Sequence, residues 1–355
     1  MRVVVTVQCA NHVHFYRHAI RRLESYGHDV HVFARQNRAV LELLDRFEIP
    51  YTELASAGSG FGDLARTQVE YEAGLLRHAR RIQPDVMTAV NAVTVGHVAR
   101  LLGARSVVFT DTECMGLLDR LARPFVDSLY APERTETEMD DVTSYPSYRE
   151  LAYLHPNTFT PDRRLRQELG QSVDHGDQLV LLTPLCWTET GEPSTEQTVE
   201  FVERLEREGA TVLIDAETSL PDGLEQRRVT IEPHRRHDAL AAVDLVIDDT
   251  ATTAVESAVL GTPAISVGDD KRRHIDELED EYGLVFSASG RNARAEAFAT
   301  AVTVLEKPPS TWQHRRERLL SETFDMTTII VTALLETNQP ARTDSESIPD
   351  ATYSR

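Results

Sequence analysis

The stretch "AVDLVIDDTATTAVESAVLGTPAIS" (242–266) carries the clearest fold signal in the chain. Its apolar start, 242–247, predicts a buried strand, and the alanine-rich segment 251–260 predicts a helix. Gly261 and Pro263 are typical of a helix end. The next apolar run, 263–267, predicts another strand. The stretch therefore indicates a strand–turn–helix–strand unit, the building block of a parallel sheet.

The turn of this unit has two interpretations. The free N–H groups and the dipole of a helix N-terminus favour an anion, and the hydroxyls of Thr250, Thr252 and Thr253 add donors. In the simpler interpretation, Asp249 or Thr250 caps the helix and binds nothing. The carboxylates of Asp248 and Asp249 oppose a phosphate unless they point away or orient the hydroxyls.

Glu256 lies among small and apolar residues within the first two turns of this predicted helix. A carboxylate on an otherwise apolar helix suits the two hydroxyls of a ribose. The alternative is a solvated glutamate on an exposed face. The residue pattern leaves both open.

Short β-rich runs alternate with helical segments along the whole chain, which predicts an α/β fold with two mostly parallel, Rossmann-like sheets. We expect domains at 1–155 and 156–337, facing across a ligand-binding cleft, and a disordered tail at 338–355. The expected strands are 2–7, 28–34, 84–90, 105–110 and, last in the first half, 127–133; then 177–185, 210–216, 227–233, 244–248 and 263–267. At the end of the chain, helices are expected at 291–305 and 311–335.

Composition excludes several classes of protein. The chain has 57 acidic and 37 basic residues, a net charge of −20, and only two lysines, which indicates adaptation to a salt-rich cytoplasm and argues against duplex nucleic acid as a partner. No apolar run approaches the ~20 residues of a membrane span. We expect a cytoplasmic protein, with peripheral membrane contact left open. The three cysteines show no disulfide or zinc spacing, and neither GxGxxG nor GxxxxGK[ST] occurs.

Two further groups of residues follow predicted strands. His12, His14 and His18 come after the first strand, where an imidazole can transfer a proton or hold a phosphate. A metal site is not expected, because no partner has metal-ligand spacing. Asp111 and Glu113 follow the strand at 105–110, where one carboxylate could act as a general base. For each residue, helix capping or surface exposure is the alternative.

Five blocks occur in the order seen in the domain-of-unknown-function 354 family, which the chain resembles from residue 1 to about 335. They are "HVHFY" (12–16), "FTDTE" (109–113), "YRELAYLHPNTFTPD" (148–162), "DTATTAVESAVLGTPAIS" (249–266) and "IDELEDEYGL" (275–284). The family looks like a GT-B glycosyltransferase and is similar in design to UDP-N-acetylglucosamine 2-epimerases. The resemblance implies two Rossmann-like domains, with the nucleotide-sugar held mainly by the second, and a last helix that returns to the first.

Carried over residue by residue, the resemblance places Thr250, Thr252 and Thr253 near a diphosphate and Glu256 on the ribose. His12 is a further candidate for binding the nucleotide-sugar. We expect a metal-independent, cofactor-free transfer of sugar to a hydroxyl of a glycan or lipid-linked acceptor. His14, Asp111 and Glu113 are the candidate catalytic residues. A nucleotide-sugar 2-epimerase, or a non-catalytic protein that binds glycan or nucleotide, are the alternatives.

Overall fold

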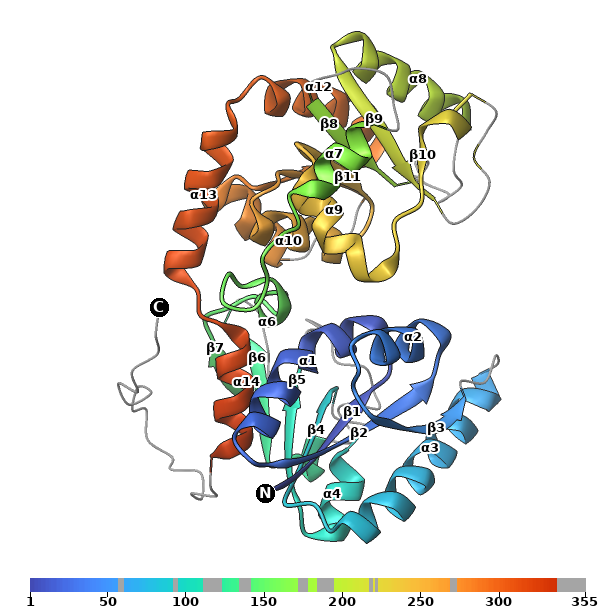
Figure 1. The fold of residues 1–355 in the computed structure, drawn as a ribbon, viewed down its shortest axis with the longest axis vertical. Helices are drawn as coiled ribbons and strands as arrows, with labels where there is room; N and C mark the ends of the chain where they lie inside the picture. The colour runs from blue at the N-terminus through green and yellow to red at the C-terminus, as the bar shows by residue number, and fades with distance from the viewer. Residues whose placement is uncertain are drawn as a thin grey trace. The chain divides into compact units, whose positions relative to one another are not determined.

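A computed structural model describes residues 1–56, 61–91, 95–110, 123–133, 142–171, 178–183, 195–216, 220, 223–268 and 273–336. The chain divides into two compact units, Met1–Thr158 with Thr323–Arg355, and Phe159–Glu322. Each unit contains its own parallel sheet with helices packed against it, which confirms the predicted α/β class with two Rossmann-like sheets (Figure 1). The tail predicted to be disordered, 338–355, lies outside the described residues.

The first unit contains a parallel sheet of seven strands in the order β3-β2-β1-β4-β5-β6-β7. Strand β1 is central, and its valines at positions 3 to 5 are fully buried because helices cover both faces of the sheet. The strands are β1 (Arg2–Val7), β2 (Asp29–Gln36), β3 (Tyr51–Ser56), β4 (Val86–Val90), β5 (Arg105–Phe109), β6 (Ser128–Pro132) and β7 (Val142–Tyr145).

Helices α1 and α2 pack together on one face of this sheet, and α3 and α4 pack together on the other (Figure 1). The last helix, α14, packs on α1 and α6. The helices of the unit are α1 (Ala10–Ser25), α2 (Arg38–Arg46), α3 (Phe61–Ile82), α4 (Gly96–Leu102), α6 (Leu151–Leu154) and α14 (Met326–Leu335), with a short 3-10 turn, η2 (Arg123–Phe125).

Polar contacts fix α14 to the first unit at both of its ends. Near its N-terminus, Arg22 Nη1 donates to Thr328 Oγ1 at 2.8 Å. At its C-terminus, Arg105 Nη2 donates to the carbonyl oxygens of Ala333 and Leu334 at 2.7 and 2.8 Å. A cation at the last carbonyls of a helix satisfies groups that have no partner within the helix and interacts favourably with the helix dipole.

The second unit contains a parallel sheet of six strands in the order β10-β9-β8-β11-β12-β13. Strand β11 lies between β8 and β12 and is buried along its whole length. The strands are β8 (Gln178–Leu182), β9 (Ala210–Asp215), β10 (Arg228–Val229), β11 (Leu245–Asp248), β12 (Ala264–Val267) and β13 (Val285–Ala288).

Helices α8 and α12 pack together against this sheet, as do α9 and α10, and α13 packs on α10. The helices are α7 (Arg164–Gln171), α8 (Thr195–Arg207), α9 (Arg236–Ala242), α10 (Ala251–Leu260), α11 (Arg273–Glu277), α12 (Ala293–Leu305) and α13 (Pro309–Glu322). Short helical turns are η3 (Glu225–Arg227), η4 (Pro233–Arg235), η6 (Gly290–Asn292) and the π-helical η5 (Leu278–Tyr282).

The structure differs from the expected elements in three ways. The strand expected over 227–233 is reduced to β10, and η4 begins at Pro233. Strands β3, β7 and β13 were not predicted, and β7 rather than the strand near 127–133 is the last of the first sheet. All three lie at sheet edges. The helix expected over 311–335 is two helices, because Asp325 begins α14: its side chain accepts a hydrogen bond from the Thr327 N–H at 2.9 Å.

Gly261 ends α10 with a φ of +89°, and a Cβ built there would lie 2.6 Å from Arg316 Cδ. We expect Gly261→Ala to lower the free energy of unfolding by about 1–2 kcal/mol, because the left-handed backbone disfavours a side chain. Gly170→Ala in α7 is the matched control: it meets no atom within 4 Å, and it should be neutral or slightly stabilising. Urea denaturation followed by circular dichroism measures both; equal losses would contradict this account.

Candidate functional site

The turn between β11 and α10 lies where the strand order of the second sheet reverses. Strand β8 has β9 and β10 on one side and β11, β12 and β13 on the other. In open parallel sheets, ligands bind beyond the carboxyl ends of the strands at this reversal. Strand β11 ends at Asp248, and α10 begins three residues later. The sheet topology therefore places this turn at the favoured ligand position of the unit.

Thr250 caps α10. Its Oγ1 accepts a hydrogen bond from the Thr253 N–H at 3.4 Å. The N–H groups of Ala251 and Thr252 have no partner among the described residues. Thr250 is exposed and Thr252 is half-buried, whereas Thr253 is buried. The capped helix and the anion site are thus compatible, because the cap uses one N–H and leaves two at the positive end of the helix.

Arg236, which was not among the predicted site residues, lies beside this turn. Arg236, the first residue of α9, donates from Nη2 to Thr253 Oγ1 at 3.0 Å. Its Nη1 donates to Asp215 Oδ2 at 3.2 Å, and Nη2 lies 3.7 Å from Asp248 Oδ2. One guanidinium therefore links the ends of β9 and β11 to the first turn of α10. Its side chain remains 35% exposed, so an arriving anion can still reach it.

The two aspartates of the turn have different environments. Asp248 is buried, and its Oδ1 accepts a hydrogen bond from the Thr250 N–H at 2.6 Å. It therefore shapes the turn instead of facing solvent. Asp249 is exposed by its surface area, but neighbouring atoms partly desolvate its carboxyl group, and this desolvation together with the Asp248 charge raises its pKa. Asp249 is consequently the carboxylate at this turn that would repel an anion.

Glu256 is buried on α10 and contacts His237. The His237 Nε2 and Glu256 Oε1 atoms are 3.1 Å apart, and both side chains are about 95% buried. The ring of Phe159 packs edge-on against His237, with centroids 6.2 Å apart. His237 thus holds the Glu256 carboxylate in one position on the helix that begins at Thr250.

The first sheet has the same reversal at β1, which lies between β2 and β4. His12 lies in the first turn of α1, which follows β1. Burial, and to a lesser degree the charge of Arg149, lower its pKa to about 4, so the imidazole is neutral at pH 7. The Gln8 N–H donates to its Nδ1 at 3.4 Å, which leaves the proton on Nε2. In this state His12 is a hydrogen-bond donor and a weak base.

His14 occupies a different environment from His12. Its ring packs against Phe47 and Tyr153, with centroid distances of 5.7 and 5.3 Å. The side chain is buried within the first unit. These two ring contacts are the contacts of His14 that distinguish it from His12. Asp111 and Glu113, the other predicted catalytic residues, lie outside the described residues, directly after the end of β5.

Neither a metal-binding cluster nor a membrane-spanning helix occurs among the described residues. No group of three or more His, Cys, Asp or Glu side chains is arranged to hold a metal ion there. No helix in that part of the chain combines the length and the apolar character needed to cross a bilayer.

The lowered pKa of His12 predicts sensitivity to acid. Between pH 6.5 and 4 an unfolded histidine binds a proton that folded His12 does not, so the free energy of unfolding falls as the pH falls through this range. Urea denaturation of His12→Gln should show about 1–2 kcal/mol less destabilisation between pH 7 and pH 5 than wild type. Some loss should persist, because burial and Arg17 also lower the pKa of His18 to about 4. Identical losses in both proteins would contradict this burial of His12.

Solved structures of two enzyme classes share the fold. UDP-GlcNAc 2-epimerase from Neisseria meningitidis bound to UDP-GlcNAc is 13% identical, with a TM-score of 0.69 over 94% of this chain and 100% of that one. The S. aureus MnaA–UDP structure is 12% identical, with a TM-score of 0.66 over 93% and 95%. Spinosyn rhamnosyltransferase SpnG complexed with thymidine diphosphate is 14% identical, with a TM-score of 0.63 over 94% and 99%.

At these identities the similarity shows the fold alone. No curated protein matches the sequence at a significant level. The family described as "Protein of unknown function (DUF354)" matches residues 1–338, which is nearly the whole chain. The chain is therefore a member of the DUF354 family, with the two-sheet architecture of GT-B glycosyltransferases and UDP-GlcNAc 2-epimerases.

Proposed function

We propose that the protein is a glycosyltransferase whose second unit holds the diphosphate of a nucleotide-sugar at the N-terminus of α10. One observation carries the proposal: at the strand-order reversal, the N–H groups of Ala251 and Thr252 and the guanidinium of Arg236 lie at one turn, whose Thr250 hydroxyl donates to Thr253 Oγ1 at 2.8 Å. UDP and thymidine diphosphate, the ligands in two structures with this fold, belong to this chemical class.

The chemistry requires stabilisation of a leaving group. When the sugar departs, negative charge develops on the phosphate oxygen that it leaves. Preorganised N–H donors and a guanidinium aimed at that oxygen lower the barrier without reorganisation. In this proposal Arg236 and the end of α10 supply the positive charge, and the transfer needs neither a metal nor a cofactor.

The nucleoside is proposed to extend along α10 toward Glu256. A carboxylate accepts hydrogen bonds from two ribose hydroxyls, and His237 holds this carboxylate at 3.1 Å. Thr252, half-buried in the first turn of the helix, adds a hydroxyl near the phosphates. Thr253 contributes through Arg236, because its hydroxyl accepts from that guanidinium.

A carboxylate is the proposed base that activates the acceptor hydroxyl. His14 packs against two aromatic rings. His12 is neutral at pH 7 because its pKa is about 4, and its one ring proton is on Nε2. Neither environment suits a base that works at neutral pH. Asp111 or Glu113, which follow the carboxyl end of β5, take the role in this proposal, with the neutral His12 as a hydrogen-bond donor to substrate.

A 2-epimerase is the second candidate, because epimerase structures match the chain as well as transferase structures do. The two differ in their need for an acceptor. Conversion of a UDP-sugar to its epimer without any acceptor, followed by NMR, would favour the epimerase. Consumption of the donor only when a hydroxyl acceptor is added would favour the transferase.

Calorimetric titration with UDP and thymidine diphosphate, in KCl that keeps the protein folded, tests the binding step. Arg236→Ala should weaken binding about tenfold or more, because a charge-assisted hydrogen bond is lost. Asp249→Asn should strengthen binding about threefold or more, because a like charge near the phosphates is removed. The matched control is Arg235→Ala, which removes the neighbouring guanidinium that pairs with Glu168 at 2.9 Å.

Each outcome decides between stated alternatives. Opposite shifts for the variants at 236 and 249, with Arg235→Ala near wild type, support a diphosphate site at this turn. Equal weakening by the substitutions at 235 and 236 would point to a general effect of net charge and contradict the assignment. If the folded wild-type protein binds neither UDP nor thymidine diphosphate, Thr250 is only a helix cap and both enzyme proposals are wrong.

A further inference from the structure

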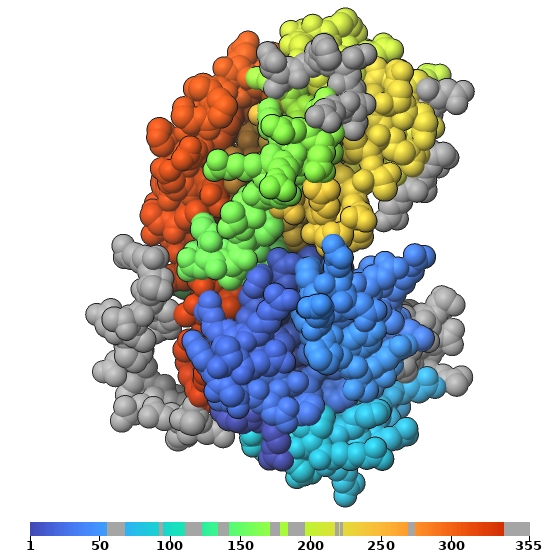
Figure 2. Space-filling model, viewed as in Figure 1, coloured from blue at the N-terminus to red at the C-terminus, as the bar shows by residue number. Residues whose placement is uncertain are grey.

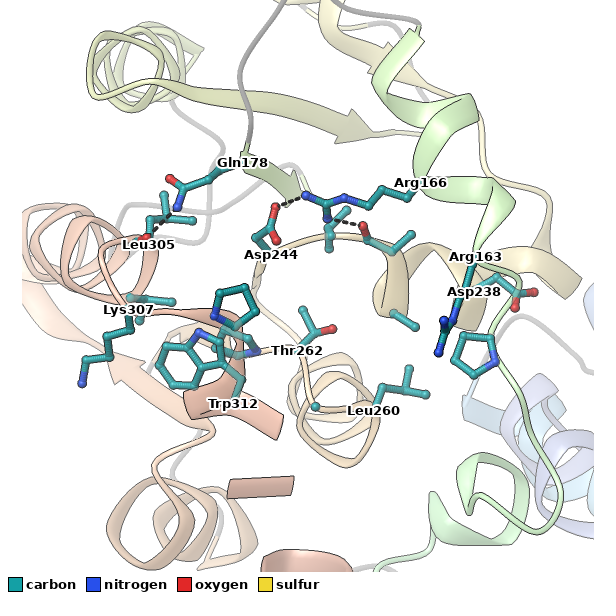
Figure 3. Close-up of a pocket in the computed structure, with 18 of the residues that line it drawn as sticks. Arg163, Arg166, Gln178, Asp238, Asp244, Leu260, Thr262, Leu305, Lys307 and Trp312 are labelled. Carbon is teal, nitrogen blue, oxygen red and sulfur yellow. Dashed lines mark hydrogen bonds and ion pairs between the residues drawn. The ribbon is translucent and has the colours of Figure 1, made fainter. Parts of the chain in front are cut away.

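The second unit has a cavity of about 510 Å³ at the opposite end of β11 from the Asp248 turn (Figure 3). The starts of three strands contribute to its wall. Gln178 begins β8, and Asp244 and Pro263 immediately precede β11 and β12. Its volume lies within the range of pockets that bind small molecules. Because it lies at the amino ends of the strands, this cavity is separate from the proposed nucleotide site.

The carboxylates that line the cavity are all engaged. Asp244 Oδ2 accepts hydrogen bonds from Arg166 Nη2 at 2.7 Å and from the Leu179 N–H at 2.8 Å. Asp238 Oδ1 accepts one from the Asp162 N–H at 2.8 Å. Asp162 itself lies 3.9 Å from an Arg235 nitrogen. Asp244 is therefore closely paired with a cation, Asp162 lies at the limit of ion-pair distance from one, and Asp238 is held by a backbone hydrogen bond.

Two cations of the lining are not compensated in this way. Arg163 and Lys307 have no carboxylate within ion-pair distance among the described residues. Figure 3 shows them at opposite ends of the cavity. Arg163 is exposed and precedes α7, which lies on the surface of the second unit (Figure 2, bright green). Lys307 lies 5.8 Å from the ring centroid of Trp312. Two cations without a carboxylate partner among the described residues are unexpected in a chain with a net charge of −20.

Part of the wall of the cavity is apolar, beside polar side chains such as Gln178 and Thr262. Trp312 is the largest lining side chain, and it is joined by Val243, Leu260 and Val304. An apolar ligand body gains free energy when such a wall removes it from water. An acidic group on that body would find Arg163 or Lys307 at the ends of the cavity.

We propose that this cavity is a second binding site, for a small amphipathic anion with a carboxylate, sulfonate or phosphate group on an apolar body. The aromatic sulfonate 8-anilino-1-naphthalenesulfonate is the probe, and the uncharged N-phenyl-1-naphthylamine is its matched control. Both dyes fluoresce when they leave water, so fluorescence titration gives both dissociation constants.

Charge reversal at the cavity should act on one dye only. Arg163→Glu and Lys307→Glu should each weaken sulfonate binding about threefold to tenfold and leave the neutral dye unchanged. Arg164→Glu, at the exposed neighbouring position that does not line the cavity, should change neither. Ala241→Phe, which fills the cavity, should weaken both dyes, with circular dichroism confirming that each variant is folded.

Two results would overturn the proposal. One is sulfonate binding that is the same in wild type, Arg163→Glu and Lys307→Glu. The other is sulfonate binding that Arg236→Glu abolishes while the cavity variants retain it, because the probe would then occupy the turn before α10. Neither result depends on nucleotide binding, so this proposal and the proposed function can fail independently.

Discussion

The guanidinium of Arg236 is the interaction on which the candidate site depends. It joins Asp215 at the end of β9, Asp248 at the end of β11 and Thr253 in the first turn of α10. Without this cation, two carboxylates would stand uncompensated beside a helix N-terminus. With it, Asp248 can shape the turn through the Thr250 N–H, and the amides of α10 remain available to an anion. The sheet topology places the turn at the strand ends, and Arg236 offsets the negative charge of Asp215 and Asp248 beside it.

The central strands could be predicted from sequence because helices cover both faces of the sheets, which makes those strands continuous apolar runs. The predicted helix 251–260 matches α10, since Gly261 and Pro263 mark its end. Strands β3, β7 and β13 are edge strands. An edge strand pairs on one side only and is partly exposed, so its sequence lacks the apolar run that reveals a central strand. The break before α14 had a signal in Asp325, an N-cap residue inside an apparently continuous helix.

The site could be predicted only in part, for a related reason. Position at a strand end can be inferred from sequence, and the candidate residues after β1 and β11 do lie at strand ends. Side-chain partners arise from tertiary structure. The contact of Glu256 with His237 joins residues 19 positions apart, and the Arg236–Asp215 pair spans 21. His12 and His14 are two residues apart and equally plausible in sequence, yet only His14 packs between Phe47 and Tyr153. Arg236 has the same sequence feature as the threonines, because it too follows a predicted strand, 227–233.

The central claim is that the N-terminus of α10 holds a diphosphate. A crystal structure of the protein with saturating UDP or thymidine diphosphate tests it most directly. The account predicts phosphate density within hydrogen-bond distance of the Ala251 and Thr252 N–H groups, with Arg236 in contact and Glu256 on the ribose side. Phosphates bound elsewhere on the protein, with the turn at Thr250 unchanged and empty, would contradict it.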